Sequence, residues 1–246
     1  MSATIGEHDQ FLDGLLADGL PSFVAAAHEL KSPLVLIRQL SLALENTDLS
    51  IIDQKRMLRQ ISLTSERALR LTSDLTRSIR LSDALFNLEP INPRQLCEDI
   101  ICELKPLFEA HNRDIKLVSR KNPLLLVANR DLLRRIIMNF SDNALRYAEL
   151  NKSVQINIGL INAGQVVRLG VRDYGPSLSS DVLAELKIRL SNTSTTIYAR
   201  PQSSGLGLYI ASQFANSMNG KIGVTRHRDG STFYVDLQAS RQLSLL

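Results

Sequence analysis

Residues 139–147 read NFSDNALRY, and this stretch organises the second half of the chain. It lies within a helical pattern over 131–147, where four- and three-residue steps place Asn139, Asn143 and Arg146 on one helix face. Neutral amide oxygens suit Mg²⁺, which takes few protein ligands, and a cation on the same face can neutralise phosphate charge. The simpler alternative for this segment alone is a polar face turned to solvent.

Strand patterns and helical patterns surround this stretch. Asn92 can cap a helix that has Pro93 at its first position. Strands are expected at 115–118, 124–127, 154–160, 166–171, 222–226 and 232–237, with further helices at 93–110, 180–190 and 205–218. This mixture predicts an α/β two-layer sandwich over residues 89–246. The Ser- and Thr-rich stretch 191–204 has no apolar period, which is typical of a lid or binding loop.

Residues 1–88 have a different, wholly helical texture. Two apolar stripes at three- and four-residue steps flank a break at 46–48, and this pattern predicts an antiparallel helical hairpin. The stripes comprise Leu20, Val24, Ala27, Leu30, Leu34, Ile37 and Leu42, then Ile52, Leu58, Ile61, Ala68, Leu71, Leu75 and Ile79. Because two helices cannot cover both stripes, we expect a homodimer that forms a four-helix bundle. The alternative is that the hairpin packs on its own C-terminal half. The expected fold class is α+β.

Composition narrows the function classes. The 246 residues are 44% hydrophobic and 22% charged, as in ordinary globular chains, and a net charge of +4 is spread along the sequence. Aromatic residues are only 5% and Trp is absent, which argues against a nucleic-acid reader built on base stacking. Cys97 and Cys102 have no metal-ligand company and suit a reducing cytosol. With no basic leader and no long apolar run, we expect a cytoplasmic chain without a membrane span.

A second informative segment is HELKSPL, residues 28–34. His28 has the adjacent carboxylate of Glu29, which can hold the imidazole tautomer or accept its proton. Ser32 follows one turn later, and Pro33 removes an amide and loosens the helix beside the histidine. A single histidine on a helix is more often a surface or core residue, so the segment needs support from the rest of the chain.

That support is a family resemblance. Residues 28–34 resemble the phospho-acceptor motif of two-component histidine kinases, H-E-x-x-[ST]-P-L, and residues 139–147 resemble the N-box of the same family. The resemblance implies that His28 is the phosphoryl acceptor, with Glu29 and Ser32 as its catalytic neighbours. It also implies that Asn143 ligates Mg²⁺, while Asn139, Arg146 and Tyr147 surround ATP.

Three later segments extend the resemblance. Asp173 and Gly175 match the family's G1 box, D-x-G-x-G, in which the aspartate binds the adenine amino group, but Pro176 and Ser177 depart from it. Gly205, Leu206 and Gly207 resemble the G2 box before a helix, where backbone amides can face phosphates. Thr232 lies in a segment that resembles the terminal G-x-T-F hairpin.

The resemblance implies a kinase that phosphorylates His28 from Mg-ATP and passes the phosphoryl group to an aspartate of a response-regulator receiver domain. Phosphatase activity toward that partner and an upstream sensor protein also belong to this expectation. One alternative is a dimeric phosphotransfer or receiver-docking module with a degenerate ATP site, supported by Pro176, Ser177 and the lack of an aromatic F-box. A gyrase-type ATPase is disfavoured by residues 28–34, and a generic helical interaction protein leaves the motifs unexplained.

Overall fold

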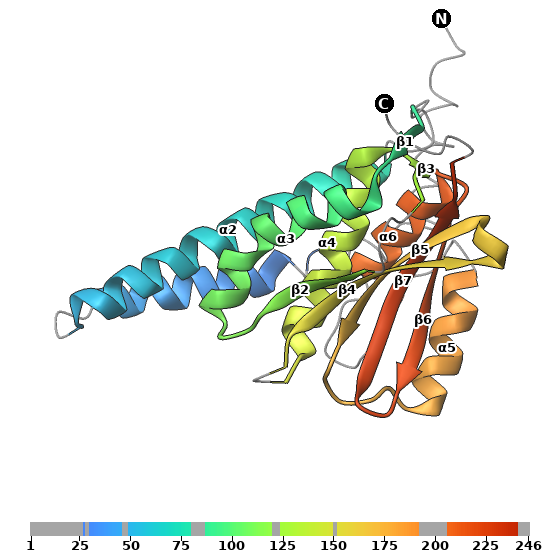
Figure 1. The fold of residues 1–246 in the computed structure, drawn as a ribbon. Helices are drawn as coiled ribbons and strands as arrows, with labels where there is room; N and C mark the ends of the chain where they lie inside the picture. The colour runs from blue at the N-terminus through green and yellow to red at the C-terminus, as the bar shows by residue number, and fades with distance from the viewer. Residues whose placement is uncertain are drawn as a thin grey trace, which may run out of the picture.

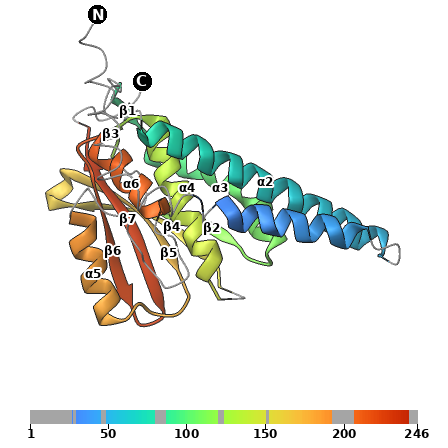
Figure 2. The same ribbon diagram turned by 180° about the vertical axis from the view of Figure 1, so that it is seen from behind.

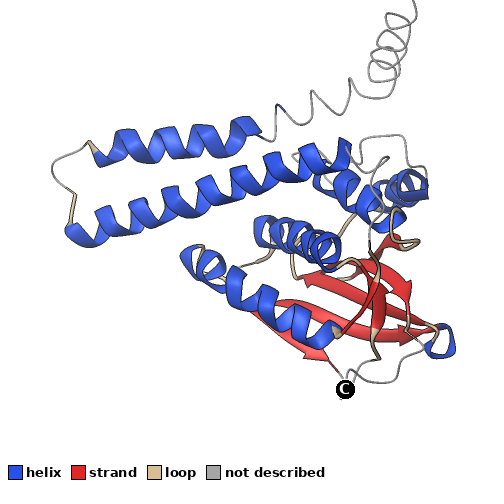
Figure 3. Ribbon diagram, turned by 90° about the horizontal axis from the view of Figure 1, so that it is seen from above, coloured by secondary structure: helices blue, strands red, loops and turns tan. Residues whose placement is uncertain are grey.

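The computed structural model describes residues 27, 30–45, 49–79, 87–119, 124–149, 152–191 and 206–240. A helix over residues 30–44 and the long helix α2 (Ile51–Ile79) lie side by side and antiparallel, and together they project from a mixed α/β body (Figures 1 and 3). The helical hairpin is therefore present over the described residues. Its pairing with a second copy stays a prediction.

The body is built on a five-stranded sheet of order β2-β4-β5-β7-β6. Its strands are β2 (Ile115–Ser119), β4 (Val154–Ile161), β5 (Val166–Asp173), β6 (Lys221–His227) and β7 (Gly230–Gln238). β2 runs parallel to β4, and the remaining neighbours are antiparallel. A separate antiparallel pair joins β1 (Glu89–Ile91) to β3 (Leu126–Ala128).

Helices pack on the sheet and enclose the core. They are α3 (Pro93–Ala110), α4 (Arg130–Tyr147), α5 (Ser180–Ser191) and α6 (Leu206–Asn216), with a short 3₁₀ turn η2 at Asn162–Gly164. In β5 and β7 the inward positions alternate with the outward ones, so Val171 and Phe233 are buried while Arg172 and Thr232 face the other side. Phe140 of α4 lies with its ring centroid 6.1 Å from that of Phe233, which joins the central helix to the sheet.

The start of α3 follows from its sequence. The side chain of Asn92 accepts hydrogen bonds from the backbone amides of Arg94 and Gln95, and Pro93 occupies the first turn. Two of the amides that a helix leaves without partners at its N-terminus are thereby satisfied. The predicted cap is confirmed. Asn129 caps α4 in the same way by accepting from the amide of Leu132.

The hairpin leans on the body through α2 (Figures 1 and 2). Leu63, Leu71 and Leu75 of α2 pack against the core cluster of the body, as the alternative reading of the stripes allowed. Other apolar side chains of the hairpin remain exposed in the single chain, namely Leu34, Val35, Leu42, Ile51, Ile52, Leu58 and Leu69. The C-terminal part of the second stripe thus packs on the body, whereas Ile52 and Leu58 of the same stripe remain exposed, as do Leu34 and Leu42 of the first.

Several sequence predictions need adjustment. The strand expected at 124–127 is Leu126–Ala128, and it pairs with β1 outside the main sheet, a strand that the sequence did not indicate. β5 runs to Asp173 rather than ending at 171, so this aspartate belongs to the strand itself. Residues 192–204 of the expected loop lie outside the described part of the chain. Among the described helices, none combines the length and apolarity that a membrane span requires.

Candidate functional site

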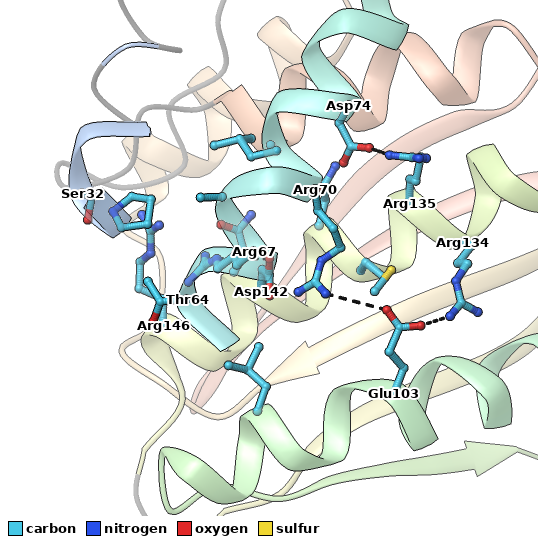
Figure 4. Close-up of a pocket in the computed structure, with 18 of the residues that line it drawn as sticks. Ser32, Thr64, Arg67, Arg70, Asp74, Glu103, Arg134, Arg135, Asp142 and Arg146 are labelled. Carbon is cyan, nitrogen blue, oxygen red and sulfur yellow. Dashed lines mark hydrogen bonds and ion pairs between the residues drawn. The ribbon is translucent and has the colours of Figure 1, made fainter. Parts of the chain in front are cut away.

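The hairpin and the body enclose a cavity of about 340 Å³ between them. Ser32, Pro33 and Leu36 line it from the first hairpin helix, and Thr64 and Arg67 are among the lining residues from α2. On the opposite side, the lining residues are Asn139, Asp142, Asn143 and Arg146 of α4, with Gly207 and Leu208 of α6. Figure 4 shows Ser32 and Arg146 at the same end of this cavity. Two motifs separated by about a hundred residues therefore meet at one place.

The predicted helix face is present. Asn139, Asn143 and Arg146 all line the cavity, as their spacing on α4 requires. Tyr147 differs from them because it lies at the C-terminal end of α4, outside this cavity, with its backbone carbonyl against Gly175.

Ion pairs cross the boundary between hairpin and body around the cavity. Arg67 Nε lies 3.2 Å from Asp142 Oδ2, and Asp74 pairs with Arg135. Arg70 Nη1 is 3.7 Å from Glu103 Oε1, and this glutamate also pairs with Arg134 (Figure 4). Asp74 is buried with only 7% of its side chain exposed, and burial lowers the pKa of Arg135. Charged residues, and not only the leucines of α2, hold the hairpin on the body.

Two buried polar atoms of residues that line the cavity lack hydrogen-bond partners within the described residues. They are Asn139 Nδ2, a donor, and Asp142 Oδ1, an acceptor, and both atoms are buried. A buried polar atom without a partner is costly, so such atoms commonly mark a place for a ligand or water. A donor on the same helix face as Arg146 suits a phosphate oxygen, and an acceptor next to Asn143 in the chain suits a hydrated cation. The residues present fit Mg-ATP.

Metal-binding residues of the usual kind do not gather in the described part of the chain. No group of three or more His, Cys, Asp or Glu residues there could hold a metal ion. A Mg²⁺ site that depends on one amide, phosphate oxygens and water does not need such a group.

Asp173 occupies a separate, buried position at the end of β5, with 2% of its surface exposed. Its Oδ1 accepts hydrogen bonds from the backbone amides of Gly175 (3.2 Å) and Ser231 (3.3 Å), and its Oδ2 accepts one from the Ser231 hydroxyl (2.7 Å). These contacts fix the orientation of the carboxylate. A fixed, buried acceptor is what recognition of an exocyclic amine requires.

Gly175 and Gly230 allow the chain to pass close to Asp173. A Cβ atom on Gly175 would lie 2.2 Å from the backbone oxygen of Tyr147, and one on Gly230 would lie 2.1 Å from that of Asp173. Gly230 also has a φ of +139°, which other residues rarely adopt. The turn after β5 is thus packed between the end of α4 and the start of β7.

The side chain of Thr232 points away from Asp173, although the two residues lie on paired strands. It faces the outer side of the sheet, where its hydroxyl contacts His227 Nε2 at 2.9 Å, and its neighbour Ser231 is the residue that bonds to the aspartate. The period of two could have identified Ser231, because the apolar Phe233 must face inward and residue 231 shares its side.

The other predicted residues are only partly described. Gly207 lines the cavity, and a Cβ atom there would meet nothing within 4 Å. Leu206 begins α6, whereas Gly205, His28 and Glu29 lie outside the described residues. Of the three predicted catalytic residues, Ser32 is the one that the structure describes, and it lines the cavity.

Comparison with known proteins agrees with this arrangement. Residues 128–241 match the family described as histidine kinase-, DNA gyrase B-, and HSP90-like ATPase. The sensor protein kinase PmrB of Pseudomonas aeruginosa is 29% identical over 215 residues, which cover 86% of this chain and 43% of PmrB. In sequence the chain is similar to sensor histidine kinases. The histidine protein kinase SaeS of Staphylococcus epidermidis is 26% identical over 86% of this chain and 61% of SaeS.

Solved histidine kinases share the fold. Full-length ShkA, crystallised in complex with AMPPNP, superposes with a TM-score of 0.59 at 22% identity over 92% of this chain and 47% of ShkA. ThkA, crystallised in complex with the response regulator protein TrrA, gives a TM-score of 0.61 at 17% identity over 95% of this chain and 66% of that chain. This chain spans about half of the length of the relatives PmrB and SaeS.

Proposed function

We propose that this chain is the ATP-dependent protein-histidine kinase core of a two-component system, with residues 1–88 as dimerisation and phospho-acceptor domain and residues 89–246 as ATP-binding domain. The observation that carries the proposal is the cavity between hairpin and body. One turn of helix separates Ser32 from His28 in sequence, and Ser32 lines the same cavity as Asn139, Asn143 and Arg146. The shared cavity of Ser32 and these α4 residues supports a transfer from a nucleotide on α4 to the proposed acceptor segment.

The residues have complementary roles in the proposed reaction. Asn143 would ligate Mg²⁺, which supplies charge neutralisation at the phosphates, while Asn139 and Arg146 would hold phosphate oxygens. A nitrogen of the His28 imidazole would attack the γ-phosphorus as its bond to the ADP oxygen breaks. Glu29 would accept the imidazole proton. Positioning and charge account for most of the rate in such a transfer.

The second half of the proposed cycle involves a protein partner. The phosphoryl group would pass from His28 to an aspartate of a response-regulator receiver domain. In phosphatase activity toward that partner, the Ser32 hydroxyl would assist water in hydrolysing the aspartyl phosphate, which releases inorganic phosphate. The relative ThkA was crystallised with a response regulator, which supports a partner of this class. We also propose that the input comes from an upstream sensor, and that the kinase acts in the cytoplasm, where ATP is available.

A homodimer is part of the proposal. Leu34, Leu42, Leu58 and Leu69 are 54% to 68% exposed on the hairpin, and a second copy would cover them in a four-helix bundle.

One observation favours a second candidate, a dimeric receiver-docking module with a weakened ATP site. Pro176 and Ser177 replace the later residues of the G1 pattern next to Asp173. The two candidates differ in the binding of Mg-ATP and in labelling by it.

The test is incubation of the purified chain with γ-labelled ATP and Mg²⁺, alongside His28→Gln. The kinase proposal requires label on the wild-type chain and none on the variant, with ATP affinity by calorimetry unchanged in the variant. A folded wild-type dimer that binds no ATP and takes up no label would support the docking module instead.

A further inference from the structure

The turn after β5 ends at Ser177, where the G1 pattern has its second glycine. The Ser177 hydroxyl donates a hydrogen bond to the backbone carbonyl of His227 at 2.8 Å and accepts one from Arg226 Nε at 3.1 Å. Both partners lie at the end of β6, about fifty residues further along the chain. A glycine at this position could make neither bond.

The same β6–β7 hairpin holds the beginning of the turn. Ser231 donates to Asp173 from both its backbone amide and its hydroxyl, and Arg172 Nη2 lies 2.7 Å from Asp229 Oδ1. Both ends of the turn, Asp173 and Ser177, are therefore attached to the β6–β7 hairpin.

The other side of the turn contacts the end of α4. The amide of Glu149 donates to the carbonyl of Tyr174 at 2.8 Å, and Gly175 lies directly against the carbonyl of Tyr147. Because the amide of Gly175 also donates to Asp173 Oδ1, movement of the turn would be passed to the carboxylate. Pro176, with its fixed φ, further limits that movement.

We propose that Ser177 is a positioning residue for purine recognition: its hydroxyl anchors the turn so that Asp173 is held ready to accept the 6-amino group of adenine. Serine in place of the glycine thus makes the turn more rigid and does not destroy the binding site. This inference rests on the proposed binding of ATP, and it takes for Asp173 the role that the resemblance to the G1 box implies, acceptance of the adenine amino group.

The proposal makes a prediction opposite in sign to that of a degenerate site. Ser177→Gly restores the family's glycine, and it would improve ATP binding if the serine had weakened the site. If the serine is an anchor, Ser177→Gly and Ser177→Ala both lose two hydrogen bonds, and we expect affinity for Mg-ATP to fall by about five- to tenfold. Ser177→Thr keeps a hydroxyl and should retain most of the affinity.

Calorimetry with Mg-ATP and Mg-ITP separates base recognition from general destabilisation, since ITP has a 6-oxo group in place of the amine. The ratio of the two affinities should fall toward one in Ser177→Gly and Ser177→Ala and return in Ser177→Thr. Ser217→Ala is a matched control, because it removes a hydroxyl that donates to the carbonyl of Phe214 just before the start of β6, whereas Ser177 bonds to the end of that strand. This control should leave the ratio unchanged.

Amide hydrogen exchange of the nucleotide-free chain gives a second measurement. Exchange across residues 173–177 should be faster in Ser177→Ala than in the wild type or in Ser177→Thr. Equal or tighter ATP binding by Ser177→Gly, with an unchanged ATP-to-ITP ratio, would overturn the assignment of Ser177 alone. Absence of ATP binding by the wild-type chain would overturn the proposed function and this assignment together.

Discussion

Gly175→Ala should damage both the stability of the body and its nucleotide site. The new Cβ would lie 2.2 Å from the backbone oxygen of Tyr147 and 3.0 Å from its carbonyl carbon. Carbon atoms do not approach a backbone oxygen so closely, so the turn and the end of α4 must separate by about 1 Å. Overpacking of this kind costs about 1–3 kcal/mol. For a domain of this size the cost corresponds to a Tm lower by about 2–12 °C.

The same displacement should reach Asp173, the proposed acceptor for the adenine amino group. The amide of Gly175 donates to Asp173 Oδ1, so a shifted turn moves or releases the carboxylate. We expect affinity for Mg-ATP, measured by calorimetry, to fall by about tenfold, which corresponds to about 1.4 kcal/mol. Thermal unfolding of the same samples reports the loss of stability.

Gly159→Ala is the matched control. Gly159 also lies in the body, on the neighbouring strand β4, yet a Cβ atom there would meet nothing within 4 Å. It should bind Mg-ATP as the wild type does and unfold at a similar temperature. If Gly175→Ala behaved like Gly159→Ala in both measurements, the close packing of the turn against α4 would not govern the site.

Three further predictions test other parts of the account. Asn143→Ala should abolish Mg²⁺-dependent nucleotide binding by calorimetry, and unchanged affinity would rule out its role as metal ligand. Asp74→Asn leaves the partly buried Arg135 without its carboxylate, and urea unfolding should show a free energy of unfolding lower by about 1–3 kcal/mol, between the values for exposed and buried ion pairs. A double variant that adds Arg135→Gln should lose less than the sum of the two single changes. Light scattering should find a dimer at micromolar concentration, and replacing Leu58 and Leu69 with Glu should give a folded monomer; a wild-type monomer would contradict the bundle.

Much of the fold could be predicted from the sequence because its signals are local. The Asn92 cap with Pro93 fixes the start of α3, and the strand pattern over residues 166–171 identifies β5, although the strand itself continues to Asp173. The strand Glu89–Ile91 was missed because it is three residues long and contains a proline. Such a strand is defined by its pairing with Leu126–Ala128, not by its own residues.

The candidate site, like the fold, could be predicted only in part. Helical spacing was enough to place Asn139, Asn143 and Arg146 on one face. The ion pairs of Asp74 and Arg67 with α4 could not be predicted, because they depend on how the hairpin leans on the body. The hydrogen bond of Ser177 to His227 joins residues fifty positions apart, so the sequence could not predict it. Comparison with the G1 pattern shows only that a serine stands in place of a glycine.

The most direct test of the central claim is the chemical stability of the bond formed with γ-labelled ATP. A phosphoryl group on the imidazole nitrogen of His28 is lost in acid and kept in base, whereas an ester on a hydroxyl such as that of Ser32 survives acid. We predict label that is acid-labile, base-stable and absent from His28→Gln. Acid-stable label, or label that persists in His28→Gln, would contradict the assignment of this chain as a histidine kinase that uses His28.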